Sequence, residues 1–341
     1  MLVSVVIPTC NRASMIGDAI DSALRQTYSK REIIVMDDGS TDETPAVLAR
    51  YGSAIRVLRQ PNAGAGVARN RAIDSARGDL IAFLDDDDEW FDFKLALQVA
   101  ILRARPDVGF LFTEFVVRKE EDNQVLRRGA SLWLNAQADW AAVYERAQPF
   151  SALGIGPPPG EKDFTIYSGN LYRPLLHHYY VLPTTAVVRR AAVGHDVRFA
   201  EGPIVYEDWE FFARLARTQD GAFADVETAV NRGHRTPGRL TLCSALVKHS
   251  AHVAMLEGVW EKDPAFMAAH GGELRALKSE LLTQMAKHAL LEERPDLARE
   301  ALRRRRRLAA SPPRADTALY AVLSHAPGGA GALRLARRSL H

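Results

Sequence analysis

The chain has 341 residues, enough for one large or two modest domains with a substantial core. Its hydrophobic fraction of 47% and charged fraction of 25% exclude disorder as the default, and its two cysteines, Cys10 and Cys243, imply no disulfide framework. The net charge of +2 conceals an asymmetry, since residues 271–341 contain 14 Lys/Arg and 7 Asp/Glu, a net +7 that leaves −5 on the remainder.

The first third of the chain predicts alternating strands and helices. Apolar runs predict strands over Val3–Ile7, Glu32–Met36, Ala54–Leu58 and Asp79–Leu84. Helical patterns follow the first strand, from Ile16 to Leu24, and cover Asp42–Tyr51, Gly66–Ala76 and Phe91–Ala104. Ser40 and Glu43 are spaced like a capping box. Strands this apolar, joined by helices, predict an α/β fold with a mainly parallel sheet covered on both faces.

Polar side chains follow three of these strands, where ligands of parallel sheets bind. The clusters are Pro8-Thr9-Cys10-Asn11-Arg12, Asp37 to Asp42, and the four aspartates Asp85 to Asp88. Neighbouring carboxylates repel one another, and their oxygens suit Mg²⁺ or Mn²⁺ beside the phosphates of a substrate. The aspartate run therefore predicts a metal–diphosphate site. The alternative is a solvated acidic turn that caps the following helix, with Trp90 anchoring that helix to the core.

The middle of the chain departs from this alternation. Gly154–Gly160 is a loop by composition, and Leu182–Val188 predicts a later strand that returns the chain to the cleft. The predicted acceptor pocket lies between the two, and its aromatic residues receive no role. Glu207-Asp208 forms a second acidic centre at the start of a predicted helix, where the helix dipole alone could account for the two carboxylates.

From about Leu240 onward the pattern is helical and ends in the basic run Arg303–Arg307. Such a run is more often a solvated face, although a basic tail can also bind an anionic membrane surface by electrostatic attraction. No apolar stretch approaches the length of a membrane span, and Pro8 comes too early for a signal peptide. We therefore expect a cytoplasmic protein, with peripheral contact at the inner face of the membrane as an option.

Four ordered motifs resemble those of the family-2 glycosyltransferases with the GT-A fold. They are Val5–Arg12, Ile33–Asp42, Asn62-Ala63-Gly64 with Ala68-Arg69-Asn70, and Phe83–Trp90. The resemblance is strongest over residues 1–118 and resumes at Val205–Glu210. It implies a nucleotide-sugar-binding half over 1–118, an acceptor-binding half with the catalytic-base motif over 119–240, and a helical C-terminal region over 241–341.

The resemblance also implies roles for residues of the donor half. Asp38, with Asp37, would accept a hydrogen bond from the nucleobase, and a loop containing Pro8, Thr9 and Asn11 would lie against the nucleoside. Arg69 would contact the diphosphate or an aspartate of the metal cluster, unless it is a solvated helix arginine.

Further roles concern the metal and the reaction. Asp87 would bind the metal, Asp85 would contact the ribose or the metal shell, and Asp86 would add charge near the ion. His234 falls where relatives often place a histidine near the diphosphate, and it would be a further metal ligand beside Asp87 and Asp85. Asp208 would be the general base for the acceptor hydroxyl, with Glu207 supporting it.

The function implied is a metal-dependent, inverting, non-processive transfer, with Mn²⁺ or Mg²⁺, from a nucleotide-sugar donor that we expect to be a UDP-sugar. The acceptor would be a hydroxyl of a glycan or lipid-linked saccharide, and no nucleic acid is expected as a partner. The alternative is a catalytically silent sugar- or nucleotide-binding scaffold on the same fold. Loss of the metal or base carboxylates would be its signature, and the sequence retains them. Oligomeric state stays open.

Overall fold

A computed structural model describes residues 1–119, 124–133, 139–201, 205–233, 243–308 and 315–325. The chain divides into two compact units, Met1–Arg235 and Thr236–His341. The first unit contains the residues of both predicted halves, because strands from residues 1–118 and from 119–240 join one sheet. The candidate site residues that the structure describes all belong to this unit.

The first unit is built on an 11-stranded sheet in the order β3-β2-β1-β4-β10-β6-β11-β9-β8, with β5 paired to β11 and β7 to β6. The strands are β1 (Val3–Thr9), β2 (Arg31–Asp37), β3 (Arg56–Arg59), β4 (Leu80–Phe83), β5 (Asp88–Trp90), β6 (Val108–Lys119), β7 (Val125–Leu126), β8 (Arg146–Pro149), β9 (Thr165–Gly169), β10 (Val187–Arg189) and β11 (Asp220–Gly233). The strands β3, β2, β1 and β4 are parallel neighbours, and β6 is parallel to β11. The mainly parallel sheet predicted for the nucleotide-binding part is thus confirmed.

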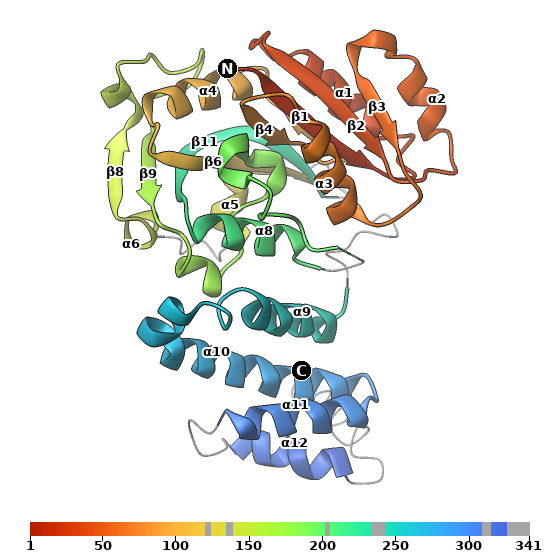
Figure 1. The fold of residues 1–341 in the computed structure, drawn as a ribbon, viewed down its shortest axis with the longest axis vertical. Coiled ribbons are helices and arrows are strands. Elements are labelled where there is room, and N and C mark those ends of the chain that lie inside the picture. Colours follow the sequence, from red (N-terminus) through yellow and green to blue (C-terminus); the bar gives the residue numbers. More distant parts are fainter. Residues whose placement is uncertain (120–123, 134–138, 202–204, 234–242, 309–314, 326–341) are drawn as a thin grey trace. The chain divides into compact units, whose positions relative to one another are not determined.

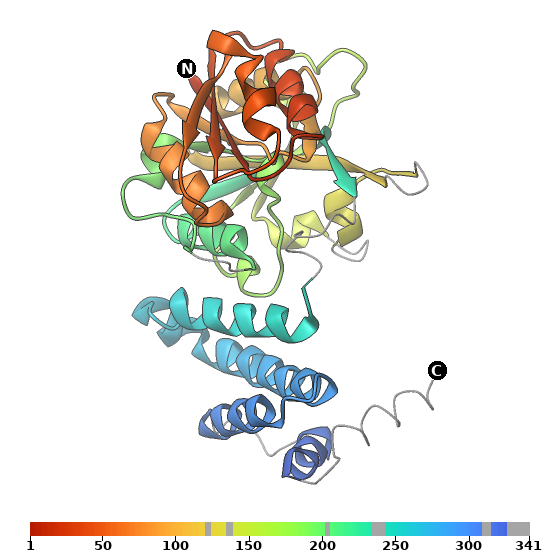
Figure 2. The same cartoon turned by 90° about the vertical axis from the view of Figure 1, so that its right-hand side faces the viewer.

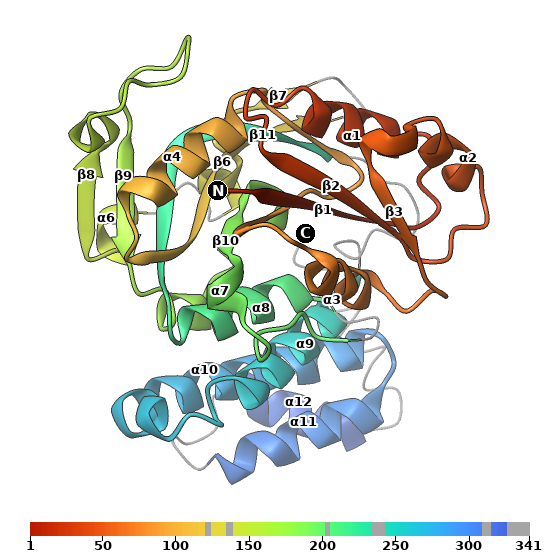
Figure 3. The same cartoon turned by 45° about the horizontal axis from the view of Figure 1, so that its top comes forward.

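Helices cover both faces of this sheet. They are α1 (Ile16–Leu24), α2 (Thr44–Ala49), α3 (Ala65–Ser75), α4 (Lys94–Ala104), α5 (Gly129–Trp133), α6 (Trp140–Val143), α7 (Arg190–Val193) and α8 (Glu207–Ala216), with short 3-10 turns at Gly52–Ala54, Phe150–Leu153, Pro174–Leu176 and Pro183–Thr185. Figure 3 shows α1 and α4 on one side of the strands and α3, α7 and α8 on the other. The amphipathic pattern of α1 buries Ile16, Ala19, Ile20 and Ala23.

The core beneath the site is aromatic. Phe83, the last residue of β4, makes edge-to-face contacts with Phe199, Phe211 and Phe212 at centroid distances of 5.4 to 6.5 Å. These rings are fully or almost fully buried, so they fix the start of the aspartate run against α8. The packing of β4 on α8 thereby places two acidic segments of the sequence at one end of the sheet.

Four details of the predicted elements are wrong. Helix α2 starts at Thr44 and not at Asp42, and no capping box forms because the Ser40 hydroxyl accepts the backbone N–H of Asn11 instead. Trp90 does not begin a helix, since it lies in β5, although its burial in the core is as expected. The predicted strand Leu182–Val188 starts with the turn Pro183–Thr185, and β10 comprises only Val187–Arg189.

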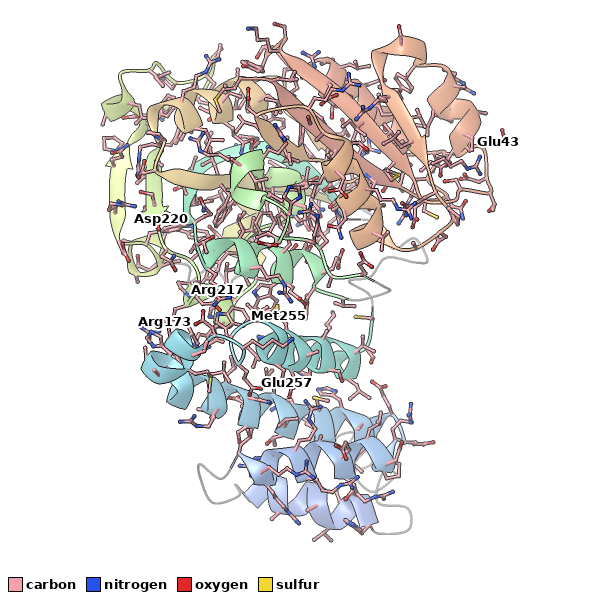
Figure 4. All side chains as sticks on the ribbon, viewed as in Figure 1. Glu43, Arg173, Arg217, Asp220, Met255 and Glu257 are labelled. Atoms are coloured by element: carbon pink, nitrogen blue, oxygen red, sulfur yellow. The ribbon has the colours of Figure 1, made fainter. Side chains whose placement is uncertain are left out.

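The second unit is helical, as predicted. It contains α9 (Ala245–Gly258), α10 (Pro264–Leu291), α11 (Pro295–Arg307) and α12 (Ala315–His325), which lie one after another in Figure 2. Lys278 of α10 is 7% exposed and donates to Glu261 at 2.7 Å, and it pairs with Glu257 of α9, labelled in Figure 4. Arg304 of α11 reaches the same Glu257 carboxylate at 2.6 Å. Along the described residues, we find no helix long and apolar enough to cross a membrane.

Candidate active site

Asn11 joins the loops that follow β1 and β2. Its backbone has a φ of +54°, a left-handed conformation that Asn tolerates better than most residues. Its Oδ1 accepts the backbone N–H groups of Thr41 at 2.8 Å and Asp42 at 3.3 Å, while its own N–H donates to Ser40 at 2.9 Å. Pro8 and Thr9, predicted in a loop, are the last two residues of β1 and pair in register with Met36 and Asp37. The two strand ends therefore form one connected surface.

Asp37 and Asp38 are both buried, and backbone and side-chain groups of neighbouring loops hold their carboxylates. Asp37 accepts the N–H of Ser40 at 2.8 Å. Asp38 accepts from the side chain of Gln60 at 2.6 Å and from the N–H groups of Ala63 and Gly64, each at 2.8 Å. Asp38 thus fixes the loop that leads into α3. These three bonds use three of its roughly four lone-pair sites.

The aspartate run divides into two parts with different surroundings. Asp88 is 1% exposed, opens β5 and accepts the side-chain N–H of Asn231 at 3.0 Å, so it joins the aspartate run to β11. Asp85, Asp86 and Asp87 are partly exposed and occupy the turn between β4 and β5. The backbone N–H of Asp85 donates to Thr184 at 3.0 Å, which ties this turn to the segment before β10.

Arg69 connects the two acidic centres. It extends from α3, is 6% exposed, and donates to Asp85 at 2.6 Å and to Glu207 at 2.9 Å. Glu207 lies 138 positions from Arg69 in the sequence. The neighbouring carboxylates raise the pKa of the guanidinium despite its burial, so it stays charged. Arg69 therefore contacts an aspartate of the run, and its burial excludes a solvated arginine.

The predicted base, Asp208, lies in the first turn of α8. Its Oδ1 accepts the backbone N–H of Trp209 at 2.7 Å, and its Oδ2 accepts the hydroxyl of Tyr179 at 2.5 Å. Burial raises the pKa of Asp208, and the bond from Tyr179 and the charge of Arg69 oppose that rise. Burial, followed by repulsion from Asp208, raises the pKa of Glu207 to about 7. The pair therefore shares a proton near neutral pH more readily than two isolated carboxylates would.

The donor set fits a hard divalent ion. Burial and the neighbouring Asp87 raise the pKa of Asp86 to about 7, although Arg12 lies 3.8 Å from its carboxylate. Such excess negative charge favours a cation, and carboxylate oxygens are the ligands that Mg²⁺ and Mn²⁺ prefer. Among the described residues no group of three or more His, Cys, Asp or Glu is placed so that it could hold a metal ion by itself. A site in which one or two aspartates bind the ion and substrate phosphates supply its other ligands matches this arrangement. His234 lies outside the described residues.

Sequence reasoning missed three contacts. The hydroxyl of Tyr179 donates to Asp208, and Arg12 forms an ion pair with Asp86. The hydroxyl of Thr184 accepts the backbone N–H of Asp85. Arg12 belongs to the first polar cluster, so its proximity to the acidic run could have been inferred from the convergence of strand ends. Nothing in the run His177-His178-Tyr179-Tyr180 distinguishes the tyrosine that reaches the base.

Comparison with known proteins identifies the family. A model described as "Glycosyl transferase family 2" matches residues 4–172. The chain belongs to glycosyl transferase family 2. Its relatives include the Escherichia coli "UDP-Glc:alpha-D-GlcNAc-diphosphoundecaprenol beta-1,3-glucosyltransferase WfgD", 38% identical over 118 residues, which are 34% of this chain and 46% of that protein. The Bacillus subtilis "Putative teichuronic acid biosynthesis glycosyltransferase TuaG" is 37% identical over 35% of this chain and 49% of its own length.

The matched segments are partial. An uncharacterized glycosyltransferase of Rickettsia prowazekii is 44% identical over 30% of this chain and 32% of its own length. The chain thus matches between about a third and a half of the length of these curated relatives.

Solved structures confirm the GT-A fold. S. aureus TarS 1-349, crystallised with UDP-GlcNAc, superposes with a TM-score of 0.53 at 15% identity and covers 88% of each chain. The mannosyltransferase PcManGT from Pyrobaculum calidifontis, in complex with GDP-Man and Mn²⁺, has a TM-score of 0.54 at 18% identity and covers 99% of this chain and 79% of its own. At such identities the likeness concerns the fold alone.

Proposed function

We propose that this family-2 glycosyltransferase moves a sugar from a nucleotide diphosphate donor to an acceptor hydroxyl. The observation that carries the proposal is the Arg69 bridge, because one buried guanidinium holds Asp85 of the donor half and Glu207 beside the predicted base. A scaffold would gain nothing from bringing these charges together, since burying them is costly. The alternative of a silent scaffold therefore has less support.

In the proposed reaction, Asp208 removes the proton of the acceptor hydroxyl, whose oxygen attacks the anomeric carbon. The bond from that carbon to the diphosphate oxygen breaks, and the nucleoside diphosphate leaves with the electron pair. A single displacement of this kind inverts the anomeric configuration and needs no carboxylate nucleophile. Asp208 is suited to the task because its burial and raised pKa make it a stronger base than a solvated aspartate.

The donor would bind at the ends of β1, β2 and β4. The remaining acceptor site of Asp38 would receive a nucleobase N–H, and Asp85 and Asp87 would hold Mn²⁺ or Mg²⁺. When bound, the ion would neutralise the charge that develops on the leaving diphosphate. We favour a UDP-sugar, because a relative of 38% identity is named for UDP-Glc and a structural neighbour was crystallised with UDP-GlcNAc. A glycan or lipid-linked saccharide is the proposed acceptor.

Calorimetric titration tests this proposal. UDP, GDP and dTDP are titrated into the chain with and without Mn²⁺, and into Asp87→Ala and the matched control Asp92→Ala, whose side chain is exposed. We expect metal-dependent binding of one nucleotide that Asp87→Ala loses and Asp92→Ala keeps. If the folded chain binds no nucleotide, the transferase proposal is refuted and the scaffold becomes the better reading.

We also propose that the protein acts in the cytoplasm and contacts the inner face of the membrane through α11. The last turn of this helix holds four arginines, of which Arg306 and Arg307 are exposed. Anionic lipid attracts such clusters by about 1 kcal/mol per cation. Co-sedimentation with vesicles containing phosphatidylglycerol should exceed that with neutral vesicles and fall in the double variant Arg306→Gln/Arg307→Gln. Equal sedimentation with both lipids would exclude this contact.

A further inference from the structure

Tyr179 holds one oxygen of the candidate base, although it lies far from both acidic motifs in the sequence. Its hydroxyl donates to Oδ2 of Asp208 at 2.5 Å, a short distance for a charge-assisted bond. The other oxygen, Oδ1, accepts the N–H of Trp209 at 2.7 Å. Together the two bonds fix the plane of the carboxylate, because each oxygen has its own donor.

The ring of Tyr179 is itself held in place. Its centroid lies 5.9 Å from that of Trp209 and 6.5 Å from that of Tyr206. The indole N–H of Trp209 donates to the carbonyl of Leu175 at 2.7 Å, which attaches α8 to the segment that carries Tyr179. The hydroxyl therefore meets Asp208 from a rigid support and not from a mobile loop end.

The backbone next to the base is strained. Tyr206, directly before α8, has a φ of +73°, which a bulky residue adopts only when its surroundings impose it. Its ring packs edge-on against Trp209 with the centroids 5.2 Å apart. The chain thus accepts an unfavourable backbone conformation at the residue that sets the direction of Glu207 and Asp208.

The bond from Tyr179 has a defined chemical effect. A hydroxyl that donates to a carboxylate favours its ionised form, and the ionised form is the one that can accept a proton. Burial raises the pKa of Tyr179 well above its usual value, and the negative charge of the nearby Asp208 raises it further. The hydroxyl therefore keeps its proton at neutral pH. Oδ2 retains a second lone pair, to which a substrate hydroxyl can donate.

We propose that Tyr179 is a positioning residue for the proposed transfer, holding Asp208 ionised and presenting the free lone pair of Oδ2 to the acceptor hydroxyl. This inference rests on the proposed function, since it assigns Tyr179 a part in activating the acceptor. Tyr179 does not exchange a proton with the substrate, and it acts only through Asp208. A purely structural role would consist of the ring contacts alone and would not need the hydroxyl.

Other charges face Asp208 and must stay unchanged in a test. They are Arg69 from α3, Glu207 from the same helix, and Asp85 from the turn after β4. The variant Tyr179→Phe removes the hydroxyl alone and keeps the ring contacts. Tyr144→Phe is the matched control, because Tyr144 is 5% exposed and its hydroxyl has no hydrogen-bond partner within the part of the chain that is described.

The first measurement is a ¹³C NMR titration of carboxyl-labelled aspartate in the full chain, with the Asp208 signal assigned through Asp208→Asn. We expect Tyr179→Phe to raise the midpoint of this signal by about one pH unit, since the ionised form loses a donor. Tyr144→Phe should leave the midpoint where it is in the wild type. A midpoint unchanged in Tyr179→Phe would overturn the proposal.

The second measurement is the release of UDP from UDP-glucose, with water as the acceptor, as a function of pH. We expect kcat to fall about tenfold in Tyr179→Phe, its acidic limb to move to higher pH, and KM for the donor to stay constant. Loss of activity without movement of the limb would show a structural role and refute the proposal. If the wild type binds no nucleotide while the NMR midpoint shifts, the proposed function fails and the part of Tyr179 in it fails with it. An unshifted midpoint in a chain that turns over donor overturns the role of Tyr179 alone.

Discussion

Replacing Arg69 by methionine should destabilise the first unit by an amount that depends strongly on pH. Methionine preserves most of the side-chain volume and removes the guanidinium that donates to Asp85 and Glu207. The two carboxylates would then lie in a buried site without their counter-charge. Removing one partner of a buried ion pair costs about 3–5 kcal/mol, and we expect a loss of that order at pH 8, above the raised pKa of Glu207.

The loss should be smaller at acidic pH. The pKa of Glu207 is raised to about 7 in the folded chain, against about 4.5 when unfolded, so the folded state binds the extra proton between these values. At pH 5.5 Glu207 is largely neutral, and only Asp85 then loses an ionic partner. We expect the destabilisation to be about 1–2 kcal/mol smaller at pH 5.5 than at pH 8, since one pKa unit corresponds to about 1.4 kcal/mol.

Urea unfolding in EDTA at the two pH values measures this difference. Four of the five tryptophans precede residue 236, so their fluorescence reports mainly on the first unit. Arg71→Met is the control, because Arg71 lies on the same helix with an exposed side chain. A destabilisation below about 1 kcal/mol, or one that is equal at both pH values, would refute the view that Arg69 balances the two acidic centres.

Three further predictions follow from single contacts. With metal removed, the free energy of unfolding should fall as pH rises from about 4 to about 7, because the pKa of Asp86 is raised to about 7 in the folded state. Urea titrations at several pH values measure this slope, and Asp86→Asn should flatten it. Asn11→Ala should destabilise the chain by about 1 kcal/mol more than Asn11→Gly by the same method, because glycine accepts the positive φ, and equal losses would contradict this. Lys278→Met should lower the free energy of unfolding of the helical unit, followed by circular dichroism, by about 1–3 kcal/mol, because Glu257 and Glu261 lose the buried ammonium that pairs with both. Lys262→Met, at an exposed side chain, should have no effect.

The sequence predicts the donor half well because its signals are local. The apolar runs of β1, β2 and β4 are short and bounded by polar residues, and a fully buried parallel strand needs no more than that. The strand ends then follow, since parallel strands place their carboxyl ends at one edge. The sequence therefore predicts that Arg69 lies in a helix that faces this edge. It does not predict which partner Arg69 contacts.

Prediction was poorer where contacts distant in sequence override local pattern. Ser40 and Glu43 satisfy the spacing of a capping box, yet the hydroxyl of Ser40 serves Asn11 on another loop. Trp90 extends β5 because that strand pairs with β11, whose residues come more than 130 positions later. The bond between Tyr179 and Asp208 depends on the packing of Trp209 against the segment before it, for which no sequence pattern exists.

The charges of the site explain why two acidic segments so far apart in the sequence can share it. The folded chain places Asp85 and Glu207 on the same guanidinium, so the two carboxylates share one positive charge. A divalent ion at the aspartate turn would compete with Arg69 for Asp85, and any weakening of that pair would strengthen the bond from Arg69 to Glu207. Because Glu207 and Asp208 repel each other, a Glu207 that is better neutralised leaves Asp208 easier to ionise. Donor binding would in this way prepare the base, and the acidic limb of the pH–rate profile should lie lower for kcat than for kcat/KM measured against the donor.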